Sequence, residues 1–190
     1  MDLAPAAAGS LLPYRGVWPT IGANVFIAPN AFVIGQVTIG DDANLWFNVV
    51  ARGDDHWIRI GARTNVQDGT IIHVFKDAHP TDIGSDVTIG HGAILHGCTI
   101  ADRAMVGIGA IVLDGARVES DAMVAAGAVV PPGKRVNSGE LWAGCPAKMV
   151  RAVRPEELTF MRDNVPSYCE LGGEYLALRR SLGTAARTGA

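Results

Sequence analysis

The sequence predicts an all-β solenoid: a left-handed parallel β-helix of hexapeptide repeats with a C-terminal α-helix packed alongside. Aliphatic residues recur at intervals of six from Ile21 onward, and a glycine or another small residue often follows each of them. The composition agrees, because 23 glycines, 10 prolines and only 18% charged residues suit many short strands joined by tight turns. Repetition at a short fixed period is the signature of stacked units.

The repeat defines the predicted coils. Three hexapeptides make one triangular coil, so about 18 units give about six coils and a prism about 29 Å long. An ordinary sandwich, with strands every 8 to 12 residues or so, fits a strict period of six poorly. The period does not determine the hand; hexapeptide solenoids resemble the left-handed family, a departure from the usual right-handed crossover. The aliphatic positions are Ile21, Ile27, Val33, Ile39, Leu45, Ala51, Ile60, Val66, Ile72, Ile83, Ile89, Leu95, Ile100, Val106, Val112, Val118, Val124 and Val130.

The repeat also sets the predicted organisation of the chain. Residues 1–20 are expected to be an N-terminal extension that caps the first turn, and residues 21–137 the β-helix. Residues 138–182 follow as a linker and C-terminal helices, and residues 183–190 as a frayed tail.

Two C-terminal helices are predicted. Pro155 and the two glutamates after it make a good helix start, because proline suits the first turn and acids suit the positive end of the helix dipole. Pro166 should break this helix, and Ser167 can cap a second one. The second helix would carry the apolar residues Leu171, Tyr175, Leu178 and Leu182.

Three irregularities interrupt the period. Residues 52–57 lengthen the step from Ala51 to Ile60, and residues 76–82 lengthen the step from Ile72 to Ile83. Both insertions are expected to leave the prism as surface loops, where functional sites are often built. The third is a five-residue step from Leu95 to Ile100, a deletion next to His96.

Charge and apolar content exclude several partners. The formal charge is -3, and no Lys/Arg run exceeds the pair Arg179 and Arg180, so neither nucleic acid nor an anionic membrane is expected. No segment approaches the roughly 20 apolar residues of a membrane span. Three scattered cysteines indicate a reducing compartment, and Asp2 stands where a signal peptide would carry positive charge. We expect a soluble cytoplasmic protein.

Three of the five histidines occupy positions in the six-residue repeat that indicate how their side chains are arranged. His73 and His96 each follow an inward-pointing aliphatic residue and lie one full coil apart, so they should stack on one face about 5 Å apart. His91 belongs to another face. In a trimer it could meet His73 and His96 of a neighbour, and three imidazoles with an open position make a catalytic zinc site. The plainer alternative is histidines that hydrogen-bond across a trimer interface; His56 and His79 are expected to be structural.

Several motifs together resemble the gamma-class carbonic anhydrase family over roughly residues 13–180. The resemblance implies a left-handed homotrimer with three interfacial metal sites, in which His73 and His96 of one subunit and His91 of its neighbour bind Zn²⁺, Fe²⁺ or Co²⁺. It implies hydration of CO2 to bicarbonate. The motifs are Arg52-Gly53-Asp54, Asn65-Val66-Gln67-Asp68, His73, Gly90-His91-Gly92-Ala93-Ile94-Leu95-His96-Gly97 and Trp142-Ala143-Gly144-Cys145-Pro146-Ala147-Lys148.

The same resemblance implies roles for residues around the metal. Gln67 would orient hydroxide or bicarbonate, with Asn65 as a weaker candidate for the same role. Arg52 would help to hold bicarbonate. Asp54 and Asp68 would complete a charged network with Arg52. The alternative for these three residues is a purely structural role in trimer contacts, and the alternative for Tyr168, which would lie near the metal, is packing in the core.

One departure concerns the acidic loop that carries a proton-shuttling glutamate in active members of the family. It is shortened here to residues 76–82, so proton export could limit turnover, unless Asp55 or Asp77 substitutes. Two other functions stay open: a hexapeptide acyltransferase or CoA thioesterase, and a non-enzymatic trimeric scaffold that binds a metal.

Overall fold

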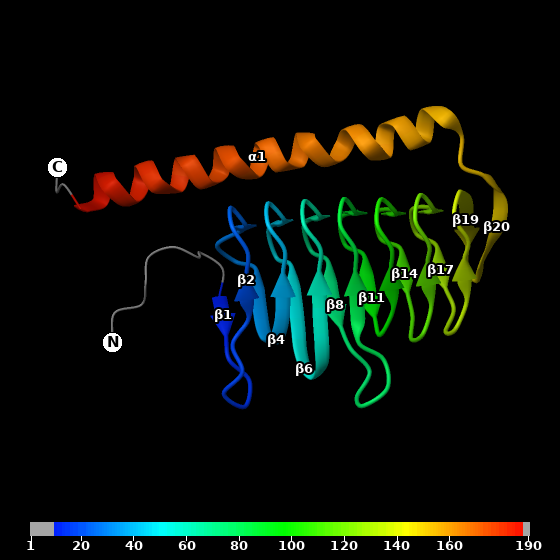
Figure 1. The fold of residues 1–190 in the computed structure, drawn as a ribbon, viewed down its shortest axis with the longest axis horizontal. Coiled ribbons are helices and arrows are strands. Elements are labelled where there is room, and N and C mark those ends of the chain that lie inside the picture. The colour runs from blue at the N-terminus through cyan, green and yellow to red at the C-terminus, as the bar shows by residue number, and fades with distance from the viewer. Residues whose placement is uncertain (1–9, 188–190) are drawn as a thin grey trace.

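The computed structural model describes residues 10–187, which form a parallel β-solenoid with one long helix beside it (Figure 1). The predicted fold class is therefore confirmed. The aliphatic repeat residues fill the interior: Val66, Ile72, Leu95 and Val112 have no exposed surface. Each coil contributes the same inward position, so the core is a continuous column of Ile, Leu and Val.

One face of the solenoid is an eight-stranded sheet. Seven of its strands are parallel, one from each of seven coils, whereas the sequence predicted about six. The extra coil arises because the chain does not leave the prism after Val136: Leu141 and Trp142 pair with Met123 and Val124 before the last strand turns back antiparallel. In chain order the strands are β3 (Phe26–Ile27), β5 (Asn44–Leu45), β7 (Asn65–Val66), β10 (Thr88–Ile89), β13 (Met105–Val106), β16 (Met123–Val124), β19 (Glu140–Gly144) and β20 (Ala147–Ala152).

The other two faces belong to a twelve-stranded sheet that divides at β6. One arm contains β8 (Ile71–His73), β11 (Ile94–His96), β14 (Ile111–Val112) and β17 (Val129–Val130). The other arm contains β9 (Thr81–Ile83), β12 (Thr99–Ile100), β15 (Arg117–Val118) and β18 (Arg135–Val136). The first coils supply β1 (Ser10–Leu12), β2 (Thr20–Ile21), β4 (Phe32–Ile39) and β6 (Val50–Ile60).

The N-terminal extension contributes strands of its own, since β1 and β2 both pair with β4. Within the predicted extension, residues 1–9 lie outside the described part of the chain, as do residues 188–190 of the predicted tail.

The first predicted insertion is not a loop. Residues 52–57 continue through β6, which pairs with β4 on both sides of a bulge: Gly53 lies opposite Gly35, and the next pair is Ile58 with Val37. Four residues of β6 thus lie opposite a single residue of β4, and the strand remains extended. The second insertion does form an exposed turn, closed by a bridge between Phe75 and His79.

A single helix, α1 (Pro155–Arg187), replaces the two that were predicted. It runs back along the solenoid over the eight-stranded sheet (Figure 1). Pro166 lies inside it, and the Ser167 hydroxyl donates to the carbonyl of Asp163 rather than capping a new helix. Packing on both sides of the proline explains the continuity, because Val165 before it and Gly172 after it are buried against the solenoid. Leu178 and Leu182 face solvent instead.

Helix α1 is the segment to consider as a possible membrane span, because it is the one long helix of the described residues. Within residues 10–187, no helix combines the length and apolar character that crossing a bilayer requires.

Candidate metal centre

His73 and His96 form a stacked pair at the ends of β8 and β11. The two residues are direct partners in the parallel ladder, and their ring centroids lie 5.1 Å apart. His73 Nδ1 and His96 Nε2 face each other at 3.1 Å. Both side chains are partly covered, with exposed fractions of 20% and 31%. The predicted pairing of these two histidines across one coil is thus confirmed.

A carboxylate holds the far nitrogen of each ring. His73 Nε2 lies 3.0 Å from Asp54 Oδ1, and His96 Nδ1 lies 2.5 Å from Asp114 Oδ1. Because an ionised carboxylate only accepts hydrogen bonds, each of these nitrogens carries the hydrogen. In the neutral rings the two facing nitrogens are then both lone-pair donors, so a cation between them would be bound by both.

That geometry fits a divalent metal ion. Imidazole binds zinc through an unprotonated nitrogen while the other nitrogen donates to a carboxylate, which is the arrangement at both rings. Two nitrogens bound tetrahedrally at about 2.1 Å from one ion are about 3.4 Å apart. The observed 3.1 Å is close to this separation. The donor set of His73 and His96 therefore suits one shared metal ion.

Arg52 and Asp54 extend this half of the site from the bulge of β6. Arg52 Nη1 donates to Asp54 Oδ2, and the other Asp54 oxygen faces His73. Burial acts to raise the pKa of the Asp54 carboxyl, but the hydrogen bonds from His73 and Arg52 outweigh burial and lower it below its usual value. Asp54 thus stays ionised and keeps the His73 hydrogen on Nε2.

His91 lies in a second cluster, at the turn after β10. Its Nδ1 lies 2.9 Å from Asp68 Oδ2, and Asp68 Oδ1 accepts a hydrogen bond from the backbone of Phe47. The His91 side chain is 46% exposed and Asp68 is 41% exposed. This carboxylate fixes the His91 ring in the same way that Asp54 and Asp114 fix the first two.

Gln67 connects His91 to the sheet beneath α1. The Gln67 side chain is buried; its Oε1 accepts from the His91 backbone at 3.2 Å, and its Nε2 donates to Asn65 Oδ1 at 3.2 Å. Asn65 in turn donates to Thr88. Tyr168 reaches the same network from α1: burial and the Asp68 charge raise the pKa of its hydroxyl, while a hydrogen bond with Gln67 opposes them.

The two clusters do not meet within one chain. In the portion of the chain with described side chains, no three His, Cys, Asp or Glu residues gather closely enough to hold a metal ion. His73 and His96 lie on one face with Arg52 and Asp54, whereas His91 accompanies Gln67, Asn65, Asp68 and Tyr168 at another corner. The structure therefore presents two half-sites. The assignment of all three histidines as metal ligands, with His91 from a neighbouring subunit, stays a prediction.

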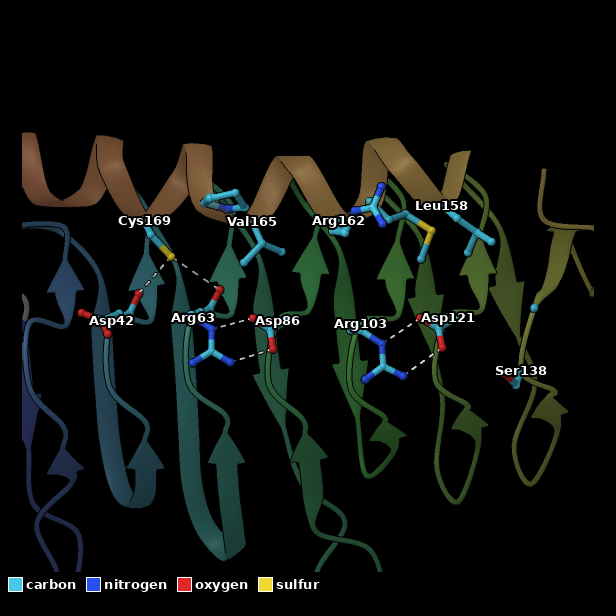
Figure 2. Close-up of a pocket in the computed structure, with 13 residues that line it drawn as sticks. Asp42, Arg63, Asp86, Arg103, Asp121, Ser138, Leu158, Arg162, Val165 and Cys169 are labelled. Carbon is cyan, nitrogen blue, oxygen red and sulfur yellow. Dashed lines mark hydrogen bonds and ion pairs between the residues drawn. The ribbon is translucent and has the colours of Figure 1, made fainter. Parts of the chain in front are cut away.

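A cavity beside α1 lies away from both half-sites. It has a volume of about 930 Å³ and separates the start of α1, with Leu158 and Val165, from one corner of the solenoid (Figure 2). We call this corner the charged corner: its residues on successive coils are Asp42, Arg63, Asp86, Arg103 and Asp121, all with φ between 58° and 61°. Arg63 with Asp86 and Arg103 with Asp121 form bidentate ion pairs. None of the three site histidines lines this cavity.

Fold and repeat together define a hexapeptide-repeat β-solenoid. Residues 19–53 match the family model described as bacterial transferase hexapeptide (six repeats). A hexapeptide transferase family protein from Anaplasma phagocytophilum is 45% identical with a TM-score of 0.84, and the match covers 87% of this chain and 97% of that one. A putative acetyltransferase from Bacillus cereus is 37% identical with a TM-score of 0.88, covering 90% and 99%.

Sequence identity to curated relatives shows to which family of hexapeptide-repeat proteins the chain belongs. Protein YrdA of Escherichia coli is 48% identical over 87% of this chain and 94% of its own length. A probable carbonic anhydrase of Methanocaldococcus jannaschii is 49% identical, covering 80% and 94%. The mitochondrial gamma carbonic anhydrase 1 of Arabidopsis thaliana is 43% identical, covering 84% of this chain and 60% of that protein. The chain belongs to the gamma carbonic anhydrase family, as the motifs indicated.

Proposed function

We propose that this protein is a homotrimeric, metal-dependent carbonic anhydrase that hydrates CO2 reversibly to bicarbonate. His73 and His96 of one subunit and His91 of the next would hold Zn²⁺, with Fe²⁺ or Co²⁺ as alternatives. One observation carries the proposal: two imidazoles with carboxylate-bound far nitrogens face each other at 3.1 Å. A metal ion held by these residues would supply hydroxide near neutral pH by lowering the pKa of water.

In this proposal Gln67 orients the reacting oxygen. One hydrogen of its Nε2 is committed to Asn65 and its Oε1 to the His91 backbone, so the amide cannot rotate freely. Gln67 also hydrogen-bonds with the Tyr168 hydroxyl, and in the proposed site a bond from Nε2 to hydroxide or bicarbonate would replace that contact. Asn65 acts through Gln67 in this arrangement, and Tyr168 contacts Gln67 from α1.

Arg52 supplies the positive charge for the bicarbonate product. One of its guanidinium nitrogens binds Asp54, and the other donors of the fork are available to an anion. Asp54 and Asp68 hold His73 and His91 in place. The exposed turn between Phe75 and His79 carries no glutamate, so proton export is expected to limit the rate unless Asp77 of this turn or Asp55 substitutes.

The test combines metal content, mass and activity. Metal-replete protein should be a trimer with close to one divalent metal per chain and should hydrate CO2. His91→Ala should lose metal and lower activity by about 100-fold or more, since it removes a ligand outright. His56→Ala is the matched control, because the His56 ring accepts from Trp57 and belongs to neither half-site. A metal-free monomer, or an active His91→Ala variant, would contradict the proposal.

Acyl transfer is the second candidate, because a solved relative is described as a putative acetyltransferase. The discriminating experiment incubates the purified protein with acetyl-CoA and candidate acceptors, or with acetyl-CoA alone for a thioesterase. Transfer by metal-free protein would overturn the anhydrase assignment. A trimer that binds metal but neither hydrates CO2 nor consumes acetyl-CoA would instead be a non-enzymatic scaffold.

A further inference from the structure

Asp114 has no role in the sequence analysis, yet it makes one of the short polar contacts of the candidate site. Its Oδ1 lies 2.5 Å from His96 Nδ1, and both side chains are about 30% exposed, at 29% and 31%. Asp114 follows β14, the strand stacked directly on β11. The carboxylate therefore reaches His96 from the next coil.

Two other aspartates occupy the comparable place in other coils but bind a different partner. Asp41 Oδ1 accepts from the backbone of Ala23 at 2.7 Å, and Asp102 Oδ1 accepts from the backbone of Ser85 at 2.8 Å. Each of these carboxylates tucks against a glycine of the preceding coil, Gly22 or Gly84. Asp114 tucks against Gly97 in the same way, but it binds a histidine ring instead of an amide.

The packing around Asp114 explains why its carboxylate stays at the ring. A Cβ on Gly97 would lie 2.5 Å from Asp114 Oδ1 and 2.9 Å from the Cβ of His79, so only glycine leaves room for both. His79 closes the other side, since its Cε1 would lie 3.2 Å from a Cβ on Gly115. His79 belongs to the exposed turn after β8, and that turn thus has a structural contact with the site.

We infer that Asp114 is a positioning residue that keeps the hydrogen of His96 on Nδ1 and presents the unprotonated Nε2 to the metal. This rests on the proposed function only in that a metal is the intended partner of Nε2. Without Asp114, neutral imidazole distributes its hydrogen between both nitrogens, so a part of the population would have Nε2 blocked. A carboxylate partner also raises the basicity of the ligand nitrogen.

The test measures metal affinity by competition with a chelator in intact protein. Asp114→Ala should weaken binding by about 10- to 100-fold. Asp102→Ala is the matched control. Asp102 also lies against a glycine of the preceding coil, but its partner is a backbone amide instead of a histidine ring. Asp102→Ala should change metal affinity by less than about twofold, although its loss of stability should be comparable to that of Asp114→Ala. Equal affinities for wild type and Asp114→Ala, or equal losses in the two variants, would overturn the inference.

A second measurement does not depend on a variant that folds. The ¹⁵N chemical shifts of the His96 ring in metal-free wild type should show hydrogen on Nδ1 and none on Nε2, and hydrogen on Nε2 would overturn the inference. In Asp114→Glu, a carboxylate that still reaches the ring should restore this pattern and much of the affinity. If wild type binds no divalent metal, the proposed function fails, and the ring shifts still decide the role of Asp114.

Discussion

At the scale of residues, Asp54 links Arg52 to His73 through its two oxygens. Its pKa in the folded state lies below the ordinary value of 3.8. The contribution of Asp54 to stability is therefore complete when the pH is above the ordinary, unfolded-state pKa. It disappears as the pH falls through the lower, folded-state pKa.

The corresponding experiment follows unfolding by urea at fixed protein concentration between about pH 5 and pH 2. Wild type should be more stable than Asp54→Asn at the upper end of this range, and the difference should shrink toward acid pH. Arg52→Met removes one of the two groups that lower the pKa, so the pH-dependent part of the stability difference should be smaller and its loss should be complete at a higher pH. A difference that does not change with pH would contradict the role given to Asp54.

The histidines mark what the sequence can predict about a site. Each histidine comes directly after an inward-pointing aliphatic residue and the two are three repeat units apart despite the insertion at residues 76–82, so the alignment of His73 with His96 follows from counting units. Asp114 could not be predicted in the same way. Its place beneath Gly97 repeats that of Asp102 beneath Gly84, and nothing in the spacing tells whether such a carboxylate binds a backbone amide or a ring.

At the scale of elements, α1 is attached to the solenoid by aromatic side chains. The Tyr175 ring lies 5.3 Å from Phe26, 5.4 Å from Trp46 and 5.9 Å from Phe47, measured between centroids. Trp46 also contacts Tyr168 at 5.5 Å. The helix residue that bonds with Gln67 is thus held by the same cluster.

Tyr175→Ala should accordingly lower the free energy of unfolding by about 2 kcal/mol, less than for a fully buried aromatic because Tyr175 is half-buried. Leu178→Ala, one turn further along α1, should cost less than about 0.5 kcal/mol because Leu178 is 53% exposed. Urea unfolding of both variants provides the comparison. Similar losses would show that α1 is not held by the aromatic cluster.

Elements were predicted well where the repeat is regular and poorly where pairing overrides local signals. Pro166 should end a helix by local rules, yet contacts with the solenoid on both sides keep α1 continuous. Residues 52–57 likewise stay in β6, because β4 pairs with that strand before and after the bulge. Neither contact is visible in the spacing of apolar residues.

At the scale of the whole molecule, the two half-sites make the proposed metal site a property of the interface. Subunits carrying His73→Ala and subunits carrying His91→Ala each lack one half-site, so neither homotrimer has an intact interface. In a mixed trimer, one interface joins an intact His73 and His96 pair to an intact His91. Mixed trimers should therefore recover metal and CO2 hydration.

Co-expression of the two differently tagged variants, followed by isolation of mixed trimers, measures this recovery. The matched control mixes His73→Ala with His96→Ala, which damage the same half-site and leave no intact interface in any combination. Recovery in the control, or none in the first mixture, would mean that the metal does not bind between subunits.

The charged corner has a consequence for how the coils stack. Solenoid coils resemble one another in backbone and interior, so a stacking that skips one coil would lose little in the core. At the charged corner the sign alternates along the axis through Asp42, Arg63, Asp86, Arg103 and Asp121. Skipping a coil would place carboxylate against carboxylate or guanidinium against guanidinium about 5 Å apart. The alternating charges on the outside of the prism therefore favour the correct order of the coils. The interior does little to distinguish one order from another, because it is similar in every coil.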